Sequence, residues 1–328
     1  MASTNDLVRE ALSGSVRALA KLITMVENDA PGSTEVLQQL YPRTGHAYII
    51  GITGPPGSGK STLTDKITKE LRKKEYTVGI VAVDPSSPFS GGALLGDRLR
   101  MQDVAGDEGV FVRSMATRGT LGGLSKATAD TIKILDAFGK DFILIETVGV
   151  GQDEVDIVKT ADTTLLISVP GLGDEIQALK AGIMEIGDIF VVNKADREGA
   201  DRLVTELSLM LDLNPSTTPW RPPIVKTIAT TGEGIAGVSE KILEHRQFLE
   251  EGKGLLGKRN ERARGEVINL IEQEITKYIH KMLKYDLSFD RVIEEVVARK
   301  KDPYSYAQKV TEPFAKYYQI YKVDKPKN

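Results

Sequence analysis

The sequence contains 328 residues, and its 43 Lys and Arg residues nearly balance its 46 Asp and Glu residues, for a net charge of −3. This balance argues against a general nucleic-acid-binding protein, which would need a basic surplus or one strongly basic face. There is no cysteine, which excludes disulfides, thiolate metal sites, iron–sulfur clusters and cysteine nucleophiles. No signal peptide is visible and no apolar run approaches the roughly 18–20 residues that span a bilayer, so we expect a cytoplasmic protein.

The N-terminal segment has the periodicity of a helix. Apolar residues recur at alternating steps of four and three and predict one apolar stripe: Leu12, Val16, Leu19, Ile23 and Val26. Pro31-Gly32 is expected to end this helix, and Pro42 a second short one. We therefore predict an N-terminal helical arm over residues 1–45, which either packs on the main domain or docks a partner.

The pattern changes at Ala47, where short apolar, β-branched runs begin to alternate with helical segments. Most runs are apolar throughout, as in strands that are covered on both faces of a parallel sheet. The predicted strands are Tyr48–Ile52, Val78–Val83, Phe142–Ile145, Thr164–Val169, Ile189–Val192 and Ile224–Ile228, with Val110–Val112 as a further short one. This alternation predicts a doubly wound, mostly parallel α/β sheet within residues 46–250, with ligands at the carboxyl ends of the strands.

Strand signals stop after about Ile235, and helical signals follow. A long amphipathic helix is marked by six apolar residues at helical spacing: Val267, Leu270, Ile271, Ile275, Tyr278 and Met282. A further helix is indicated by Val292, Val296 and Ala298, and the junction is expected to be loosened by Gly252, Gly254 and Gly257. We predict a helical C-terminal region over residues 251–328, through which the chain could form oligomers.

A phosphate-binding loop is the clearest motif. The pattern G-x-x-x-x-G-K-[ST] is matched by Gly54-Pro55-Pro56-Gly57-Ser58-Gly59-Lys60-Ser61, between a predicted strand and a helical run. Glycines let backbone N–H groups turn inward around a phosphate, and the helix N-terminus adds its positive dipole end. Lys60 is expected to bridge the β- and γ-phosphates, and the Ser61 hydroxyl to ligate Mg²⁺. We therefore predict nucleotide binding by Gly54–Thr62.

A guanine-recognition motif, Asn193-Lys194-Ala195-Asp196, directly follows the predicted strand Ile189–Val192. The Asp196 carboxylate can accept hydrogen bonds from both N1–H and the 2-amino group of guanine, which adenine does not offer together. Lys194 can lay its stem along the base, and Asn193 can tie this loop to the phosphate loop. Such a site rejects the wrong base because its polar atoms would be left unpaired.

The segment Thr227-Ile228-Ala229-Thr230 lies where GTPases place a backbone contact to the guanine O6. We therefore add Ile228, Ala229 and Thr230 to the predicted nucleotide site. GTPases more often have Ser-Ala here, so Ile228 departs from the usual pattern. A backbone N–H group would still serve, because it does not depend on the side chain.

Three carboxylates are candidates for the magnesium site. Asp84 and Glu146 each end a predicted strand, and Asp97 follows Asp84 in a glycine-rich loop. Carboxylates that face a phosphate loop are expected to bind Mg²⁺ or its waters, and all three need not coordinate directly. Helix capping or turn formation is the alternative for Asp84 and Asp97. An ionised Glu146 at the end of a buried strand requires a partner.

Two residues that follow Glu146 complete the predicted catalytic apparatus. Gly149 is expected to offer its backbone N–H to the γ-phosphate. Gln152 either orients the attacking water or is an ordinary surface glutamine. The predicted catalytic residues are therefore Lys60, Glu146 and Gln152.

With these motifs placed, the sequence resembles the SIMIBI-class GTPases in which the third guanine-nucleotide motif carries a glutamate, here Glu146. More narrowly, it is similar to the methylmalonyl-CoA mutase-associated GTPases, also known as lysine/arginine/ornithine (LAO/AO) transport ATPases. The stretches Arg113–Gly119 and Glu146–Gln152 are specific to that subgroup. The resemblance covers nearly the whole chain and also includes Arg17–Thr24, Tyr41–His46, Gly51–Thr64, Asp84–Pro88, Asn193–Asp196 and Asp302–Tyr304.

This resemblance implies a homodimeric chaperone for an adenosylcobalamin-dependent acyl-CoA mutase, in which GTP binding and hydrolysis gate cofactor loading and protect the mutase. It implies dimerisation through the C-terminal helices. It also implies three switch loops, near Asp84–Asp97, Glu146–Asp156 and Gly171–Gly182. The implied magnesium ligands are Ser61, Asp84, Asp97 and Glu146.

The expected reaction is GTP + H₂O → GDP + phosphate, without covalent catalysis. One alternative is a nickel-delivering GTPase, which needs soft or imidazole ligands, yet cysteine is absent and His46, His245 and His280 are far apart in sequence. Another is a kinase or ATPase linked to lysine/arginine/ornithine transport, which Asn193–Asp196 disfavours because it selects guanine. A signal-recognition GTPase is disfavoured because no Met-rich helical domain follows the core.

Overall fold

The structure, a computed structural model, describes residues 4–84, 104, 106–116, 126–147, 157, 159–171, 187–213, 219–252, 254–286 and 288–320. It contains two compact units, Met1–Arg262 and Ala263–Asn328. The first unit carries a β-sheet, and the second is helical.

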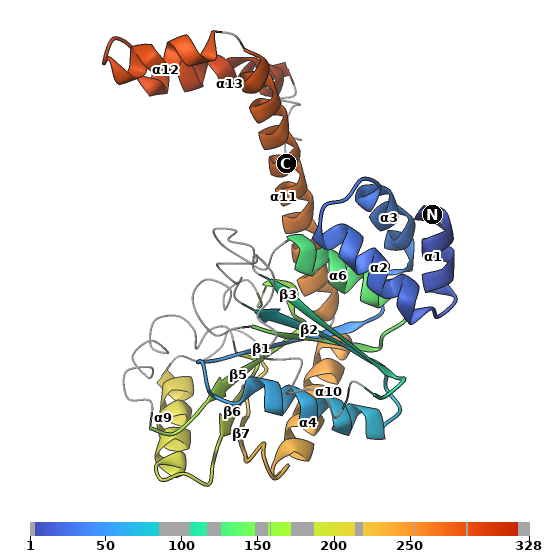
Figure 1. Ribbon diagram of the computed structural model, residues 1–328. Coiled ribbons are helices and arrows are strands. Elements are labelled where there is room, and N and C mark those ends of the chain that lie inside the picture. Colours follow the sequence, from blue (N-terminus) through green and yellow to red (C-terminus); the bar gives the residue numbers. More distant parts are fainter. Residues whose placement is uncertain are drawn as a thin grey trace, which may run out of the picture. The chain divides into compact units, whose positions relative to one another are not determined.

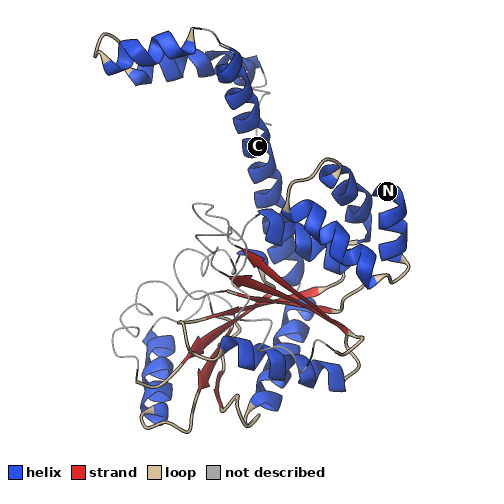
Figure 2. Cartoon of the chain, in the orientation of Figure 1, coloured by secondary structure: helices blue, strands red, loops and turns tan. Residues whose placement is uncertain are grey.

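Among the described residues, seven strands form the sheet, in the order β3-β2-β4-β1-β5-β6-β7, and every neighbouring pair is parallel (Figures 1 and 2). Four of them are buried along their whole length, as apolar runs predict for strands covered on both faces. The predicted doubly wound α/β fold is confirmed. The strands are β1 (Tyr48–Thr53), β2 (Val78–Asp84), β3 (Val110–Ala116), β4 (Phe142–Glu146), β5 (Thr163–Ser168), β6 (Ile189–Asn193) and β7 (Ile224–Thr227).

Helices cover both faces of this sheet (Figure 1). On one face, α4 (Lys60–Lys73) and α10 (Ile235–Glu251) share a core with Ile50 and Ile52 of β1. On the other, α6 (Lys126–Ala137) packs with Ile49 of β1, and α9 (Ala200–Leu213) packs on β6. This alternation follows from the two-residue period of a strand. β1 lies in the middle of the sheet and is covered on both faces. Its carboxyl end therefore fixes the position at which the following loop begins.

The N-terminal arm consists of α1 (Thr4–Leu12), α2 (Val16–Glu27), α3 (Ser33–Leu40) and a 3₁₀ turn, η1 (Tyr41–Arg43). The prediction of one helix from Leu12 to Val26 was wrong. Gly14 has a left-handed φ of 96°, and the Ser15 hydroxyl accepts a hydrogen bond from Ala18 N and caps α2. Val16, which is 55% exposed, therefore lies outside the buried stripe. The arm packs on α6 and shares the core of the sheet.

We expect Leu22→Ala in α2 to lower the free energy of unfolding of the unit Met1–Arg262 by about 2–5 kcal/mol. Leu22 is completely buried in the core that also contains Val81 and Ile143 of the sheet. Its truncation removes apolar contacts and leaves a cavity. Urea unfolding followed by circular dichroism would measure the loss, with Lys21→Ala, at an exposed position of the same helix, as the control. An unchanged midpoint for Leu22→Ala would contradict the shared core.

A buried histidine lies at the opposite end of the sheet from the predicted nucleotide site. The Nδ1 atom of His245 lies 2.8 Å from the Thr163 hydroxyl, and its ring packs on Trp220 with centroids 4.6 Å apart. Burial lowers the pKa of His245 to about 4, although the Asp188 carboxylate, 3.5 Å from Nε2, opposes this shift. His245 is therefore neutral in the folded protein at pH 7.

His245 should make stability depend on pH. Its pKa is lower in the folded protein than in the unfolded chain, so its contribution is complete above about pH 6.5 and is lost as the pH falls towards 4. The loss amounts to about 3 kcal/mol across that window. Urea unfolding between pH 7 and pH 4.5 should show a shallower decline for His245→Asn than for the wild type. The exposed His280→Asn should follow the wild type, and parallel curves for all three proteins would refute the assignment.

The second unit is built from α-helices. α11 (Gly254–Tyr285) begins before the boundary between the units, and α12 (Phe289–Val297) and α13 (Pro303–Ile320) follow. The two predicted helices are confirmed, whereas α13 was not predicted. It begins where Asp302 Oδ1 accepts from Ser305 N at 2.7 Å, with proline at the first helical position. Of the glycines predicted to loosen the junction, Gly252 is the C-cap of α10, whereas Gly254 and Gly257 lie inside α11, so the prediction was wrong for these two.

Large apolar side chains are exposed on α11, including Val267, Leu270, Ile271, Ile275 and Tyr278. These are the residues whose helical spacing predicted an amphipathic helix, so the apolar face exists but has no cover among the described residues. Within the described part of the chain, no helix combines the length and apolar character that a membrane span requires.

Candidate functional site

The phosphate-binding motif forms the turn between β1 and α4. Gly54, Gly57 and Gly59 have φ angles of 144°, 73° and 92°, which side chains disfavour. At Gly54 a Cβ atom would also lie only 2.3 Å from the carbonyl oxygen of Ile167 in β5. Glycine is therefore required where β1 turns, and the turn delivers the chain to the N-terminus of α4, where backbone N–H groups and the helix dipole favour a phosphate.

Lys60 stands at the first position of α4 with its ammonium group held over the loop. Its Nζ atom donates to the carbonyl oxygens of Gly54, at 2.8 Å, and Pro55, at 3.0 Å. The side chain is only 6% exposed. A buried ammonium at this position requires oxygen partners, and phosphate oxygens are stronger partners for it than carbonyl oxygens.

The Ser61 hydroxyl donates to Oε1 of Glu146 at 2.5 Å, and both residues are buried. Parallel pairing of β1 with β4, with Ile52 opposite Glu146, brings the glutamate beside the loop that follows β1. The pair offers one hydroxyl and one carboxylate, the hard oxygen donors that Mg²⁺ prefers. These two residues therefore fit a magnesium ion.

Four predicted residues cannot be placed completely. The backbone of Asp84 ends β2, next to β4, but its side chain lies outside the described part of the structure. Asp97, Gly149 and Gln152 also lie outside the described residues. The structure therefore brings together Lys60, Ser61 and Glu146 from the predicted catalytic and metal sets.

Asn193, at the end of β6, joins the two predicted nucleotide loops. Its Nδ2 atom donates to the carbonyl oxygen of Ser58 in the phosphate loop at 2.7 Å. Its Oδ1 atom accepts from the Thr227 hydroxyl and from Ala229 N, each at 3.1 Å. The side chain is 1% exposed, so each of these bonds is shielded from water. One amide thus fixes the phosphate loop, the guanine motif and the segment after β7 relative to one another.

Lys194 adds a second connection between the same loops. It adopts a left-handed φ of 56°, uncommon outside glycine, and its Nζ atom donates to the carbonyl oxygen of Gly57 at 2.6 Å. The guanine loop turns here, with Ala195 N donating to Thr227 O and Arg197 N to Lys194 O, each at 3.0 Å. Asp196 lies on the turn and is exposed, so its carboxylate is accessible to a base.

The third predicted segment lies beside Asn193, and two of its backbone N–H groups are already engaged. Ile228 N donates to Glu233 O at 3.0 Å, and Ala229 N donates to Asn193 Oδ1. The N–H of Thr230, the third residue proposed to contact the guanine O6, takes part in neither of these two hydrogen bonds. Ile228, which departs from the usual Ser-Ala pattern, pairs through its backbone with Glu233 in a short antiparallel bridge.

Asn193→Ala should weaken GTP binding by about 10-fold or more. The two nucleotide loops lose the hydrogen bonds that connect them, and Ser58 O and Ala229 N each lose a partner. We expect the protein to remain folded. Isothermal titration calorimetry would give the dissociation constant, and circular dichroism would verify folding. Asn269→Ala, at an exposed position of α11, is the matched control. Wild-type affinity in Asn193→Ala would contradict the proposed role.

Most of the chain matches a known protein family. Residues 19–283 match the family described as "Methylmalonyl Co-A mutase-associated GTPase MeaB". The chain belongs to this family. The match includes both nucleotide loops, so the bonds from Asn193 and Lys194 lie inside the part of the chain that defines the MeaB family.

Curated relatives agree with this assignment. The MeaB-family chain is 55% identical over 315 residues to a protein of Pyrococcus horikoshii named for an inferred GTPase activity, covering 95% of this chain and 98% of the relative. It is 34% identical over 286 residues to the mouse protein "Methylmalonic aciduria type A homolog, mitochondrial", covering 81% and 69%. It is 33% identical over 257 residues to "GTPase ArgK" of Escherichia coli, covering 76% and 77%.

Among solved structures, a crystal structure described as an LAO/AO transport system kinase matches 95% of this chain and 97% of its own, with a TM-score of 0.71 at 23% identity. At this identity the match concerns the fold. It extends beyond the GTPase sheet, and confirms an α/β core with helical additions as the architecture.

Proposed function

We propose that this MeaB-family protein is a GTPase that hydrolyses GTP to GDP and phosphate and acts as a chaperone for an adenosylcobalamin-dependent acyl-CoA mutase. The observation that carries the GTPase proposal is the pair of bonds from Asn193 and Lys194 to the phosphate loop. They hold a guanine-reading carboxylate, Asp196, at a fixed distance from a phosphate-binding turn. A purine nucleoside triphosphate could bind with its base at Asp196 and its phosphates at this turn.

In this proposal hydrolysis depends on positioning and charge stabilisation. The backbone N–H groups of Gly57–Ser61 surround the β-phosphate, and Lys60 leaves its carbonyl partners to bind the β- and γ-phosphate oxygens. Ser61 and Glu146 would hold Mg²⁺, which neutralises phosphate charge when it is bound. Asp84 and Asp97 are further proposed ligands, Gly149 is proposed to bind the γ-phosphate, and Gln152 to orient water.

The partner proposal rests on the family and on one relative. The family description names methylmalonyl-CoA mutase, and the mouse relative is named for methylmalonic aciduria. The exposed apolar face of α11 supports the proposal that residues 251–328 mediate homodimerisation, since a face of this kind is unusual in a monomer. We propose a cytoplasmic location for the dimer and its mutase.

Co-purification of the full chain with purified acyl-CoA mutases, followed by GTP turnover with and without each mutase, tests the chaperone proposal. A bound mutase that accelerates turnover supports it. Absence of both binding and stimulation across the candidate mutases would remove the chaperone role and leave GTP hydrolysis standing.

A protein kinase is the second candidate, because one matching structure is described as a transport system kinase. Kinase activity would transfer the γ-phosphate to a protein hydroxyl instead of water. Incubation with γ-³²P-labelled GTP and ATP separates the two reactions, since hydrolysis releases labelled phosphate and a kinase labels protein.

A further inference from the structure

A buried carboxylate lies at the amino end of β5, whereas the phosphate loop lies at the carboxyl end of the neighbouring strand β1. Asp162 is completely buried, and its Oδ2 atom accepts from Ile49 N of β1 at 2.9 Å. Its own backbone N–H donates to Ile49 O at 2.8 Å. Asp162 is therefore bonded to β1 through both its side chain and its backbone, and it needs a cation to compensate its buried charge.

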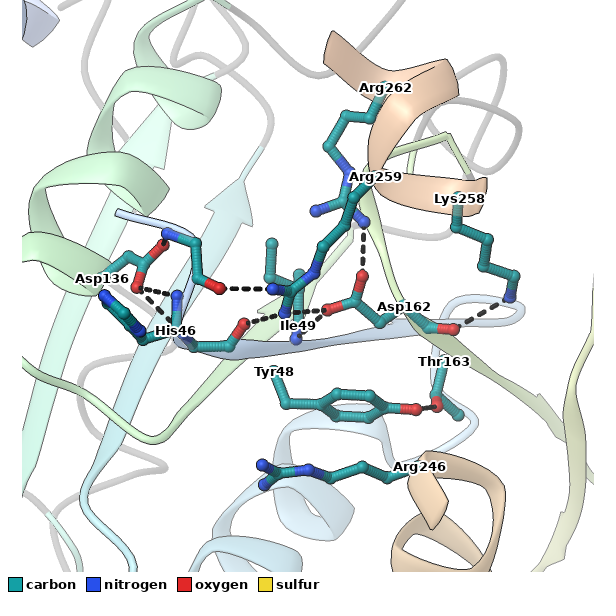
Figure 3. Close-up of polar contacts among 12 residues, drawn as sticks. His46, Tyr48, Ile49, Asp136, Asp162, Thr163, Arg246, Lys258, Arg259 and Arg262 are labelled. Carbon is teal, nitrogen blue, oxygen red and sulfur yellow. Dashed lines mark hydrogen bonds and ion pairs between the residues drawn. The ribbon is translucent and has the colours of Figure 1, made fainter. Parts of the chain in front are cut away.

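The first turns of α11 supply three cations (Figure 3). Arg262 Nη2 donates to Asp162 Oδ1 at 2.7 Å, and Arg259 Nη2 lies 3.8 Å from Asp162 Oδ2. Lys258 Nζ donates to the carbonyl oxygen of Asp162 at 2.9 Å and lies 3.3 Å from the carboxylate of Asp188, which directly precedes β6. We refer to Lys258, Arg259 and Arg262 as the basic turns of α11.

Arg259 also binds residues 45–47, which directly precede β1. Its two terminal nitrogens donate to the carbonyl oxygens of Gly45 and Ala47, the latter at 3.0 Å. From the other side, the Asp136 carboxylate accepts from the backbone N–H groups of Gly45, at 2.6 Å, His46, at 3.1 Å, and Ala47, at 2.9 Å. This short segment is thus held between α6 and α11 (Figure 3).

The basic turns therefore contact the amino ends of β1, β5 and β6. The other ends of these strands form the nucleotide site. β1 leads into the phosphate loop, β5 places Ile167 O against Gly54, and β6 ends at Asn193. Close-packed protein interiors have low compressibility and transmit strain, and these strands are packed on both faces. We therefore expect a shift of a strand at its carboxyl end, next to the nucleotide, to alter its contacts with the basic turns at its amino end.

We propose that the basic turns of α11, anchored by Asp162, are the coupling element that carries the state of the nucleotide site to the C-terminal helices. The proposal rests on the proposed GTP binding and adds a route for the signal. Asp162 is a positioning residue here, since it touches neither nucleotide nor reacting atoms. In this proposal GTP binding changes the strength of the contacts between the basic turns and the amino ends of the strands. Loss of Asp162 makes the basic turns insensitive to GTP and leaves the nucleotide site intact.

Hydrogen–deuterium exchange of residues 258–262 in the full-length protein, with and without Mg·GTP, tests the coupling. In the wild type we expect GTP to change the exchange rate by about 3-fold or more. In Asp162→Asn we expect exchange that is about 10-fold faster and insensitive to GTP, because the basic turns lose their anchor. GTP affinity, measured by calorimetry, should stay within about 2-fold of the wild type.

Two further variants keep the outcome decisive. Arg262→Gln removes the closest cation from a partly exposed position and should show the same uncoupling even if Asp162→Asn fails to fold. Arg264→Gln, an exposed arginine of the same helix, should behave as the wild type. Wild-type exchange that ignores bound GTP, or Arg262→Gln exchange that still follows GTP, would overturn the coupling while GTP binding stands. Absence of GTP binding in the wild type would overturn the proposed function and the coupling together.

Discussion

Lys60→Ala is expected to lower kcat/KM for GTP hydrolysis by about 1,000-fold or more. Lys60 is buried, and its ammonium group donates hydrogen bonds to the carbonyl oxygens of Gly54 and Pro55 in the phosphate loop. We infer that it exchanges these carbonyls for phosphate oxygens when GTP binds. Alanine would leave the charge that develops on the γ-phosphate without its nearest cation, and no neighbouring residue of the loop is basic.

Phosphate release at Mg·GTP concentrations well below KM would measure this loss in kcat/KM, and circular dichroism would verify that the variant folds. Lys73→Ala removes an exposed lysine from the last turn of the same helix and should retain full activity. More than a tenth of wild-type activity in Lys60→Ala would contradict the role given to its ammonium group.

Asp196→Asn is expected to weaken GTP binding by about 100-fold or more and to shift preference towards XTP. The carboxylate accepts two hydrogen bonds from guanine, from N1–H and the 2-amino group. An asparagine side chain accepts only one of them and presents its own N–H₂ to the other donor. Xanthine carries an oxygen where guanine carries the 2-amino group, so it is the better match for asparagine.

Competition between GTP, XTP and ATP for a fluorescent guanine nucleotide would give the three affinities. Because Asp196 is exposed, its replacement should leave the unfolding temperature unchanged. Asp201→Asn provides a control with the same charge change at an exposed position near the guanine loop. An Asp196→Asn protein that still prefers GTP to XTP would show that another group reads the base.

The sheet could be predicted from the sequence because its strands are buried on both faces and are therefore apolar without interruption. β3 was recognised only in part, since Arg113 and Ser114 interrupt its apolar run while its backbone continues to pair with β2 as far as Ala116. The stretch from Leu12 to Val26 was predicted as one helix because side-chain periodicity passes through Gly14, where the backbone breaks it.

The candidate site was predictable where function demands a fixed sequence of residue types. Phosphate loops need glycine at left-handed φ angles, and guanine needs a carboxylate beside a rigid amide, so both motifs stand out. The cluster around Asp162 has no such signature. Asp162 and Arg262 are 100 positions apart, and each is one ordinary charged residue among many until the fold brings them together.

We infer that one site binds a triphosphate at the end of β1 and recognises guanine at the end of β6. Isothermal titration calorimetry of the full-length protein with GTP and ATP, in the presence of magnesium, compares the two affinities. We expect GTP to bind at least about 100-fold more tightly than ATP. Equal affinity for the two nucleotides, or no binding of either, would contradict it.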